Sequence, residues 1–99
     1  MENKTQGEKK TFMKKVKRKR IKLVINGQEI KILAKPEDRL KNVITEALKL
    51  STYDSHRNIS EFQINMIGGV DNGNGQILTY THRALSNPIF VTLKAGTGA

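Results

Sequence analysis

Residues 20–34 read RIKLVINGQEIKILA and hold the strongest local structural signal of the chain. Apolar side chains alternate with other residues on both sides of Asn26-Gly27, as expected for two half-buried strands. Asn-Gly favours a two-residue type I′ turn, because both central residues of that turn need a positive φ. The stretch therefore predicts a β-hairpin in which Leu23 and Ile25 point to the core and Val24 points to the opposite face.

A helix is expected after the hairpin, beyond a break at Lys35-Pro36. Proline fixes its own φ and removes a ladder donor, so it ends the second strand. Asp38 is a favourable residue to accept hydrogen bonds from the free N–H groups of a helix start. Apolar residues then recur at spacings of three and four, which predicts an amphipathic helix near residues 38–50. Its apolar stripe consists of Leu40, Val43, Ile44, Ala47, Leu48 and Leu50.

Two further strands are expected in the second half of the chain. Residues 62–66 and 89–94 alternate between apolar and polar side chains, and this alternation places Phe90 on the face away from the core. Between them, residues 68–75 predict a long glycine-rich turn, and residues 77–80 predict a short additional strand. The order ββαββ indicates an α+β fold with a mixed sheet packed on one helix. The strand positions expected to be buried are Leu23, Ile25, Ile30, Ile32, Phe62, Ile64, Ile89, Val91 and Leu93.

The composition excludes several kinds of site. A chain of 99 residues, 36% of them hydrophobic, can form one modest core but not a deep enclosed active site. Because the chain contains no cysteine, it has no disulfide, thiolate metal site or cysteine nucleophile. His56 and His82 are 26 residues apart and have no obvious local carboxylate partner, so they are a poor basis for a zinc site. We therefore expect no catalytic residue, no metal and no cofactor.

The sequence contains no membrane signal. It has no apolar run of the roughly 18–20 residues that a transmembrane helix needs, and no signal-peptide pattern. The absence of cysteine suits a reducing compartment. These features predict a cytoplasmic protein without a membrane partner.

The formal net charge of +9 is concentrated near the N-terminus. Residues 1–22 carry ten Lys or Arg against two Glu, whereas residues 23–99 carry eight basic and seven acidic side chains. Residues 1–19 also hold too few apolar side chains to offset the entropy of ordering, which predicts a disordered basic extension. The basicity is therefore assigned to the extension and not to the fold. Such an extension makes weak contact with polyanions through counterion release.

The C-terminal residues Gly96, Thr97, Gly98 and Ala99 are small and directly follow the last expected strand. A backbone without bulky side chains can enter a narrow enzyme site, since glycine lets a wall of the site approach closely. The same composition is also typical of a terminus that merely frays. The expected organisation is a disordered extension over residues 1–19, a folded domain over 20–95 and a flexible tail over 96–99.

Two stretches resemble a known family. Residues 35–43, KPEDRLKNV, are similar to the strand-to-helix corner of ubiquitin, with proline, aspartate, an aliphatic residue and Asn-Val at the same spacing. Residues 90–99, FVTLKAGTGA, are similar to the L-K-A-G-x-G ending of small bacterial ubiquitin-like proteins. The resemblance covers about residues 20–99 and implies a ubiquitin-like β-grasp fold.

The resemblance also implies a function. The bacterial proteins are encoded in ubiquitination-like antiviral operons beside homologues of activating enzymes, conjugating enzymes and metallopeptidases. A chain of this kind is a protein modifier and not an enzyme. Its terminal glycine is adenylated, passed to an enzyme thiol and joined to an amine of a target protein. Gly98 would be the donor after a processing metallopeptidase removes Ala99, and ATP and magnesium would belong to the activating enzyme.

Val24 and Phe90 together form a candidate docking patch. Both are expected on the outer face of the sheet, on strands that pair in the middle of a β-grasp sheet, where an activating or conjugating enzyme could dock. Two other functions stay open. A sulfur carrier of the same fold would convert its terminal glycine to a thiocarboxylate, although such carriers usually end in Gly-Gly. A module that is not conjugated would bind a partner protein or nucleic acid through the extension or the sheet.

Overall fold

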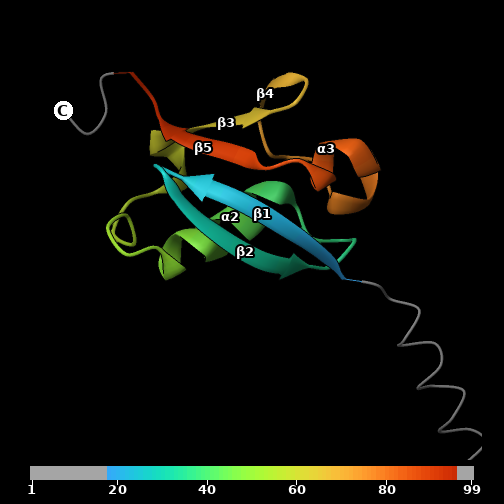
Figure 1. Ribbon diagram of the computed structural model, residues 1–99, viewed down its shortest axis with the longest axis horizontal. Coiled ribbons are helices and arrows are strands. Elements are labelled where there is room, and N and C mark those ends of the chain that lie inside the picture. The colour runs from blue at the N-terminus through green and yellow to red at the C-terminus, as the bar shows by residue number, and fades with distance from the viewer. Residues whose placement is uncertain (1–17, 96–99) are drawn as a thin grey trace, which may run out of the picture.

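The computed structural model describes residues 18–95, while residues 1–17 and 96–99 lie outside the described part. The elements in chain order are β1 (Lys19–Ile25), β2 (Gln28–Ala34), α2 (Leu40–Leu50), the 3₁₀ helix η1 (Ile59–Glu61), β3 (Phe62–Met66), β4 (Gly69–Asp71), the 3₁₀ helix η2 (Ile77–Thr79), α3 (His82–Ser86) and β5 (Ile89–Leu93). Figure 1 shows the strands arranged as one sheet, with the main helix, α2, beside it. The expected α+β class is confirmed.

Strands β1 and β2 form the predicted hairpin. Asn26 has a φ of 48° and Gly27 a φ of 91°, the pair of positive values that a type I′ turn requires. The antiparallel register runs without interruption from the turn to the pair formed by Lys19 and Ala34. Lys19 therefore belongs to the sheet and not to the extension in which the sequence analysis placed it.

The sheet is mixed, with the strand order β2-β1-β5-β3-β4. β1 pairs with β5 in parallel, whereas the other three neighbouring pairs are antiparallel. The first and last strands of the chain thus lie next to each other, away from both edges. With α2 covering one face, the arrangement is compatible with a β-grasp-like fold.

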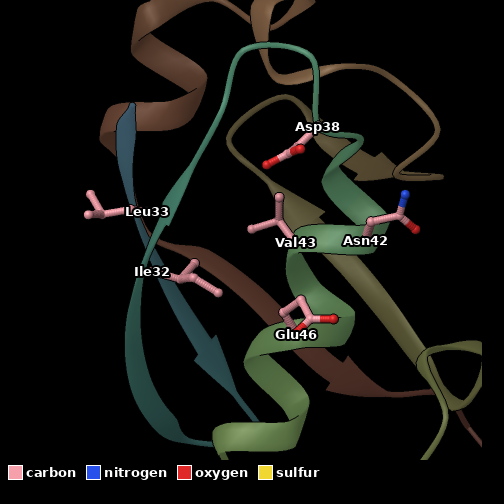
Figure 2. Close-up of a pocket in the computed structure, with 6 residues that line it drawn as sticks. All are labelled: Ile32, Leu33, Asp38, Asn42, Val43 and Glu46. Atoms are coloured by element: carbon pink, nitrogen blue, oxygen red, sulfur yellow. The ribbon is translucent and has the colours of Figure 1, made fainter. Parts of the chain in front are cut away.

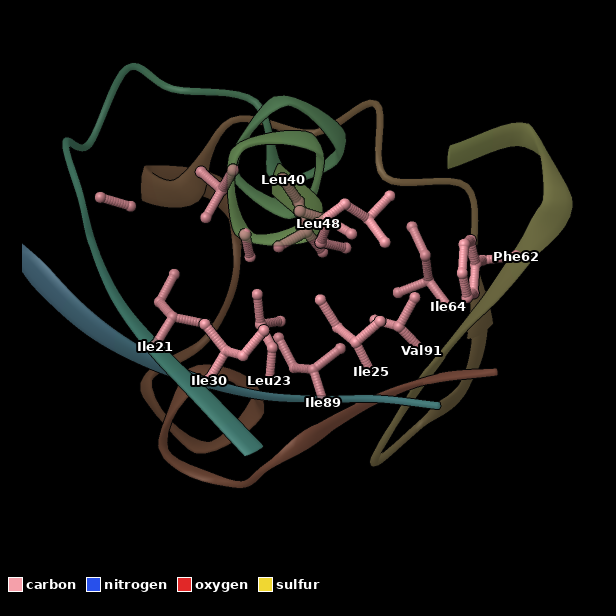
Figure 3. Packing of buried hydrophobic residues seen from close by; sticks show 14 of the residues in the cluster. Ile21, Leu23, Ile25, Ile30, Leu40, Leu48, Phe62, Ile64, Ile89 and Val91 are labelled. Carbon is pink, nitrogen blue, oxygen red and sulfur yellow. The ribbon is translucent and has the colours of Figure 1, made fainter. Parts of the chain in front are cut away.

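The core lies between α2 and one face of the sheet (Figure 3). Every residue of the expected helical stripe up to Leu48 is buried, but Leu50 is 65% exposed, so its assignment to the stripe was wrong. The spacing of three and four continues from Ala47 and Leu48 to Ser51, which is 5% exposed and donates a hydrogen bond to the Leu48 carbonyl. Of the strand positions expected to be buried, Ile32 and Leu93 are only partly buried, whereas Ile21 and Ala34 are buried without having been in the expected set.

The start of α2 is not capped by Asp38, in contrast to the prediction. The Asp38 carboxylate instead accepts a hydrogen bond of 2.9 Å from the backbone N–H of Lys35, which closes the turn before the helix. The first two N–H groups of the helix donate to the carbonyls of Gly75 and Gly73, over 3.0 and 2.8 Å. A loop distant in sequence therefore satisfies the donors that a helix start leaves free.

The segment between β3 and β5 differs from the prediction in two ways. Residues Gly69–Asp71 form the short strand β4 on β3, where only a turn was expected. Residues Ile77–Thr79 form a 3₁₀ helix and not the short strand that the sequence suggested. The N–H of Ile77 donates to the carbonyl of Asp38 over 2.8 Å, so this segment is bound to the loop before α2. The side chain of Ile77, the buried residue of this 3₁₀ helix, is part of the core.

The side chain of Tyr80 links this segment to the end of β4. Its hydroxyl donates a hydrogen bond of 2.6 Å to Oδ2 of Asp71. Burial, together with this hydrogen bond and the negative charge of Asp71, raises the pKa of Tyr80 to about 12. Because an unfolded tyrosine has a pKa near 10, the folded state holds this proton more tightly. The resulting stabilisation is complete below about pH 10 and is lost as the pH rises to about 12.

The Tyr80→Phe variant should lose stability less steeply in alkaline solution than the wild type. It lacks the phenol that ionises in this range, although the lost hydrogen bond to the charged Asp71 should lower its stability at pH 8 by about 1.5–3 kcal/mol. We expect the midpoint of urea unfolding, followed by circular dichroism, to fall further between pH 9 and 11 in the wild type. Equal falls in both proteins would contradict this role of Tyr80.

Candidate functional site

The structure shows how the chain approaches the predicted conjugation tail, although the tail itself, residues 96–99, lies outside the described residues. Strand β5 ends at Leu93 and is flanked by β1 on one side and β3 on the other. The backbone N–H of Lys94 donates to the carbonyl of Glu61 over 2.9 Å, so the path of the chain is still fixed one residue after the strand. The chain therefore reaches residue 95 from a strand that is held on both sides.

The two residues of the candidate patch, Val24 and Phe90, lie directly opposite each other. The parallel register of β1 and β5 pairs them, and these are the strands that place Leu23 and Val91 in the core. Val24 and Phe90 therefore lie on the face of the sheet opposite α2. Phe90 is 49% exposed and Val24 is half-buried. The structure thus brings together two residues that are 66 positions apart in the sequence.

These two residues are the centre of a row that crosses all five strands. The strand registers align Glu29 of β2, Val24 of β1, Phe90 of β5, Asn65 of β3 and Val70 of β4. We call these five residues the cross-strand row. The sequence identified only its two central members, because alternation tells which face a residue occupies but not which strands are neighbours.

Amide and hydroxyl groups surround Phe90 on the β3 side of the row. The Nδ2 group of Asn65 donates to the Phe90 carbonyl over 3.1 Å and to Oγ1 of Thr92 over 3.0 Å. The Nε2 group of Gln63 in turn donates to Oδ1 of Asn65 over 2.7 Å. These bonds connect β3 and β5 on the outer face and give the apolar centre of the row a neutral polar border.

Charged groups form the border on the β2 side. Nζ of Lys22 lies 3.0 Å from Oε2 of Glu29, and both side chains are about half exposed. The hydrogen bond from Lys22, and then its positive charge, hold the pKa of Glu29 below its usual value. Exposed ion pairs of this kind contribute little to stability. The main effect of this ion pair is that Glu29 neutralises the positive charge of Lys22 on the outer face of the sheet.

A second surface feature is a shallow groove of about 160 Å³ between β2 and α2. Figure 2 shows side chains of the edge strand β2 on one side and of the helix on the other, with Asp38 near the start of the helix. The groove is lined by Ile32, Leu33, Asp38, Asn42, Val43 and Glu46. This lining is apolar at its centre and carboxylate-bearing on the helix side, and it includes no histidine or hydroxyl nucleophile. The groove therefore does not provide the nucleophile and histidine of a serine- or cysteine-type hydrolase.

The two histidines lie in different segments of the described residues 18–95. His56 lies in the connector after α2 and His82 at the start of α3, and both are exposed. The Asp54 carboxylate, two residues before His56, accepts instead from Nε of Arg57 over 3.0 Å and from Nδ2 of Asn26 over 3.3 Å. This part of the chain also contains no cluster of three or more histidine or acidic side chains that could hold a metal ion.

The residues 18–95 contain no helix that is long and apolar enough to cross a membrane. Comparison with known proteins adds no assignment, since neither a protein-family model nor a curated protein matches the sequence. The functional interpretation therefore depends on the outer face of the sheet and on the strand that leads to the C-terminal tail.

Proposed function

We propose that this chain is a ubiquitin-like β-grasp protein modifier of a bacterial antiviral system, activated at Gly98 and joined to amines of target proteins. The observation that carries the proposal is the position of β5. This strand lies between β1 and β3, presents Phe90 on the outer face and leads directly into the small residues of the tail. A modifier needs such a combination, because enzymes must hold a rigid body while they react with its terminus.

The proposed chemistry is acyl transfer in three steps. The Gly98 carboxylate attacks the α-phosphate of ATP and forms an acyl adenylate with release of pyrophosphate. A thiolate of the activating enzyme then attacks the acyl carbon and displaces AMP, which gives a thioester. After transfer to a conjugating enzyme, a target amine attacks the thioester, forms an amide and releases the thiol. ATP and magnesium are bound by the activating enzyme and not by this chain.

The cross-strand row supplies a docking surface for these enzymes. Its apolar centre, Val24 and Phe90, resembles in character the small hydrophobic patches through which soluble proteins bind partners. Phe90 and Gly98 are eight residues apart, so a fully extended chain spans at most about 29 Å between them. An enzyme that contacts the patch can therefore also reach the terminus with a site on the same domain.

Gly98 becomes the donor only after cleavage behind it, which we assign to a processing metallopeptidase that removes Ala99. The target proteins are acceptors through lysine side chains or N-terminal amines. We place these reactions in the cytoplasm, where ATP and the enzymes would be available.

Mass spectrometry of the protein isolated from its host tests this function against its alternatives. We expect a fraction of the chain to end at Gly98 and to be attached through it to amines of other proteins. A terminal glycine in which sulfur replaces one carboxylate oxygen would identify a sulfur carrier instead. If only free chains with an intact Ala99 are found while the system is active, the modifier proposal is wrong and a binding module remains.

A further inference from the structure

Three cations of the folded domain gather on the outer face of the hairpin. Arg20 and Lys22 follow each other on this face of β1, and the register places Lys31 of β2 directly opposite Lys22. All three side chains are exposed. Like charges in directly opposed positions of an antiparallel pair are unfavourable, so the strand pairing itself does not require this arrangement.

Only part of this charge is neutralised within the domain. Glu29 pairs with Lys22 over 3.0 Å, whereas neither Arg20 nor Lys31 forms an ion pair with a carboxylate of residues 18–95. This described part of the chain carries twelve Lys or Arg against seven Asp or Glu, a formal net charge of +5. The assignment of the basicity to the extension alone was therefore wrong, because β1 includes cations that the sequence analysis counted with the extension.

The basic run of the sequence leads into this cluster. Seven of the nine residues from 14 to 22 are Lys or Arg, and the last four of these seven lie within the described part of the chain. The run enters the sheet at Lys19, next to Arg20, at the end of β1 that is remote from the Asn26-Gly27 turn. The cluster on the face is thus continuous along the chain with the basic segment before it.

The cluster also borders the exposed ring of Phe90. Val24, which lies opposite Phe90, is two residues from Lys22 on the same strand face. Residues two apart in a strand are about 6.6 Å apart, and neighbouring strands are about 4.8 Å apart. The backbone positions of Phe90 and Lys22 are therefore on the order of 8 Å apart, so both side chains can contact one bound nucleotide.

From these observations we propose that the outer face of β1, β2 and β5 binds single-stranded nucleic acid. Arg20, Lys22 and Lys31 would contact phosphates, and one base would stack on Phe90. Because the side-chain amides of Gln63 and Asn65 beside Phe90 are already hydrogen-bonded to each other, to Thr92 and to the Phe90 carbonyl, binding should depend little on sequence. This activity goes beyond the proposed conjugation and needs neither the C-terminal tail nor any enzyme, so the two proposals can fail separately.

The decisive measurement is the salt dependence of binding of the full-length protein to a fluorescently labelled dT 20-mer. The Arg20→Gln/Lys31→Gln variant removes two phosphate contacts, and the slope of log K against log salt should become shallower by about 1.4, or about 0.7 for each contact. A matched control is Lys41→Gln/Lys49→Gln, which removes the same charge from exposed positions on α2, the helix on the other side of the sheet. We expect the control to lose much less affinity than the face variant.

A second variant, Phe90→Leu, tests the stacking contact separately. Leucine keeps an apolar side chain in the row but lacks a ring, so affinity for the single strand should fall by about tenfold without a change in the salt slope. Affinity for a duplex of the same length should be unaffected, because its bases are not available to the ring.

Three results would overturn the proposal. The first is no binding of the 20-mer by the wild type at 100 mM salt, which would favour an acidic protein surface as the partner of the cluster. The second is an equal loss of affinity in the face variant and the helix control, which would show that only overall charge matters. The third is an unchanged single-strand affinity in Phe90→Leu, which would remove the base contact.

Discussion

Replacing Gly98 with valine should abolish charging of the protein by its activating enzyme while leaving the domain folded. Valine places a β-branched side chain beside the reacting carbonyl and restricts a backbone that must thread a narrow site. The residues of the core lie between Ile21 and Val91, so a change at position 98 should leave the melting temperature within a few degrees of the wild-type value. The assay mixes the processed protein, activating enzyme and ATP, and detects a thioester that a reductant cleaves.

The same substitution at Gly68 is the matched control. A Cβ atom at Gly68 meets open space in the loop between β3 and β4, so Gly68→Val should fold and charge like the wild type. His56→Ala and His82→Ala should also charge normally, because neither side chain takes part in the proposed acyl transfer. Charging of Gly98→Val at the wild-type rate, or failure of every partner enzyme to charge the processed wild-type protein, would contradict the modifier hypothesis.

The parts of the fold that could be predicted are those encoded by local patterns. The hairpin followed from alternation and from Asn26-Gly27, two residue types that tolerate the positive φ angles of the turn. Four of the five strands and the main helix were found in the same way, because each carries an apolar period over five or more residues. The buried face of each strand was correct for the same reason.

The errors arose where contacts between distant segments override local preference. Asp38 is a good helix cap in isolation, but the donors it was expected to bind are taken by carbonyls from the loop at residues 73–75. Residues 77–80 have strand-like composition, yet the backbone of Ile77 is bound to the loop before α2. The three-residue strand β4 is too short to show a period, so no sequence pattern could have indicated it.

The candidate site, too, was predictable only as far as local sequence patterns determine it. Val24 and Phe90 could be assigned to the outer face from alternation, but their pairing with Glu29, Asn65 and Val70 depends on the strand order. The cation cluster was missed because counting charge along the chain placed β1 residues in the extension. A count made after the strands had been assigned would have separated them.

Gly73→Ala should destabilise the domain by roughly 2–4 kcal/mol, a large share of the 5–15 kcal/mol typical of such domains. Gly73 has a φ of +75°, and an added Cβ would lie 2.8 Å from Cδ1 of Ile64 and 3.0 Å from Cβ of Lys41. The loop cannot easily move away, because the Gly73 carbonyl accepts from the Lys41 N–H over 2.8 Å and its own N–H donates to Asp71 over 2.7 Å. Relief of the clash would therefore break the hydrogen bonds that satisfy the start of α2.

Gly27→Ala separates the two causes of this loss. Gly27 also has a positive φ, +91°, but a Cβ there meets nothing within 4 Å. The stability of that variant should fall only by the cost of placing alanine in the left-handed region, about 1–2 kcal/mol. Urea unfolding of both variants, followed by far-UV circular dichroism, should show a clearly lower midpoint for Gly73→Ala. Equal midpoints would mean that the loop at residues 73–75 can move away from the added Cβ without a loss of stability. Its contact with the helix start would then not contribute to the stability of the fold.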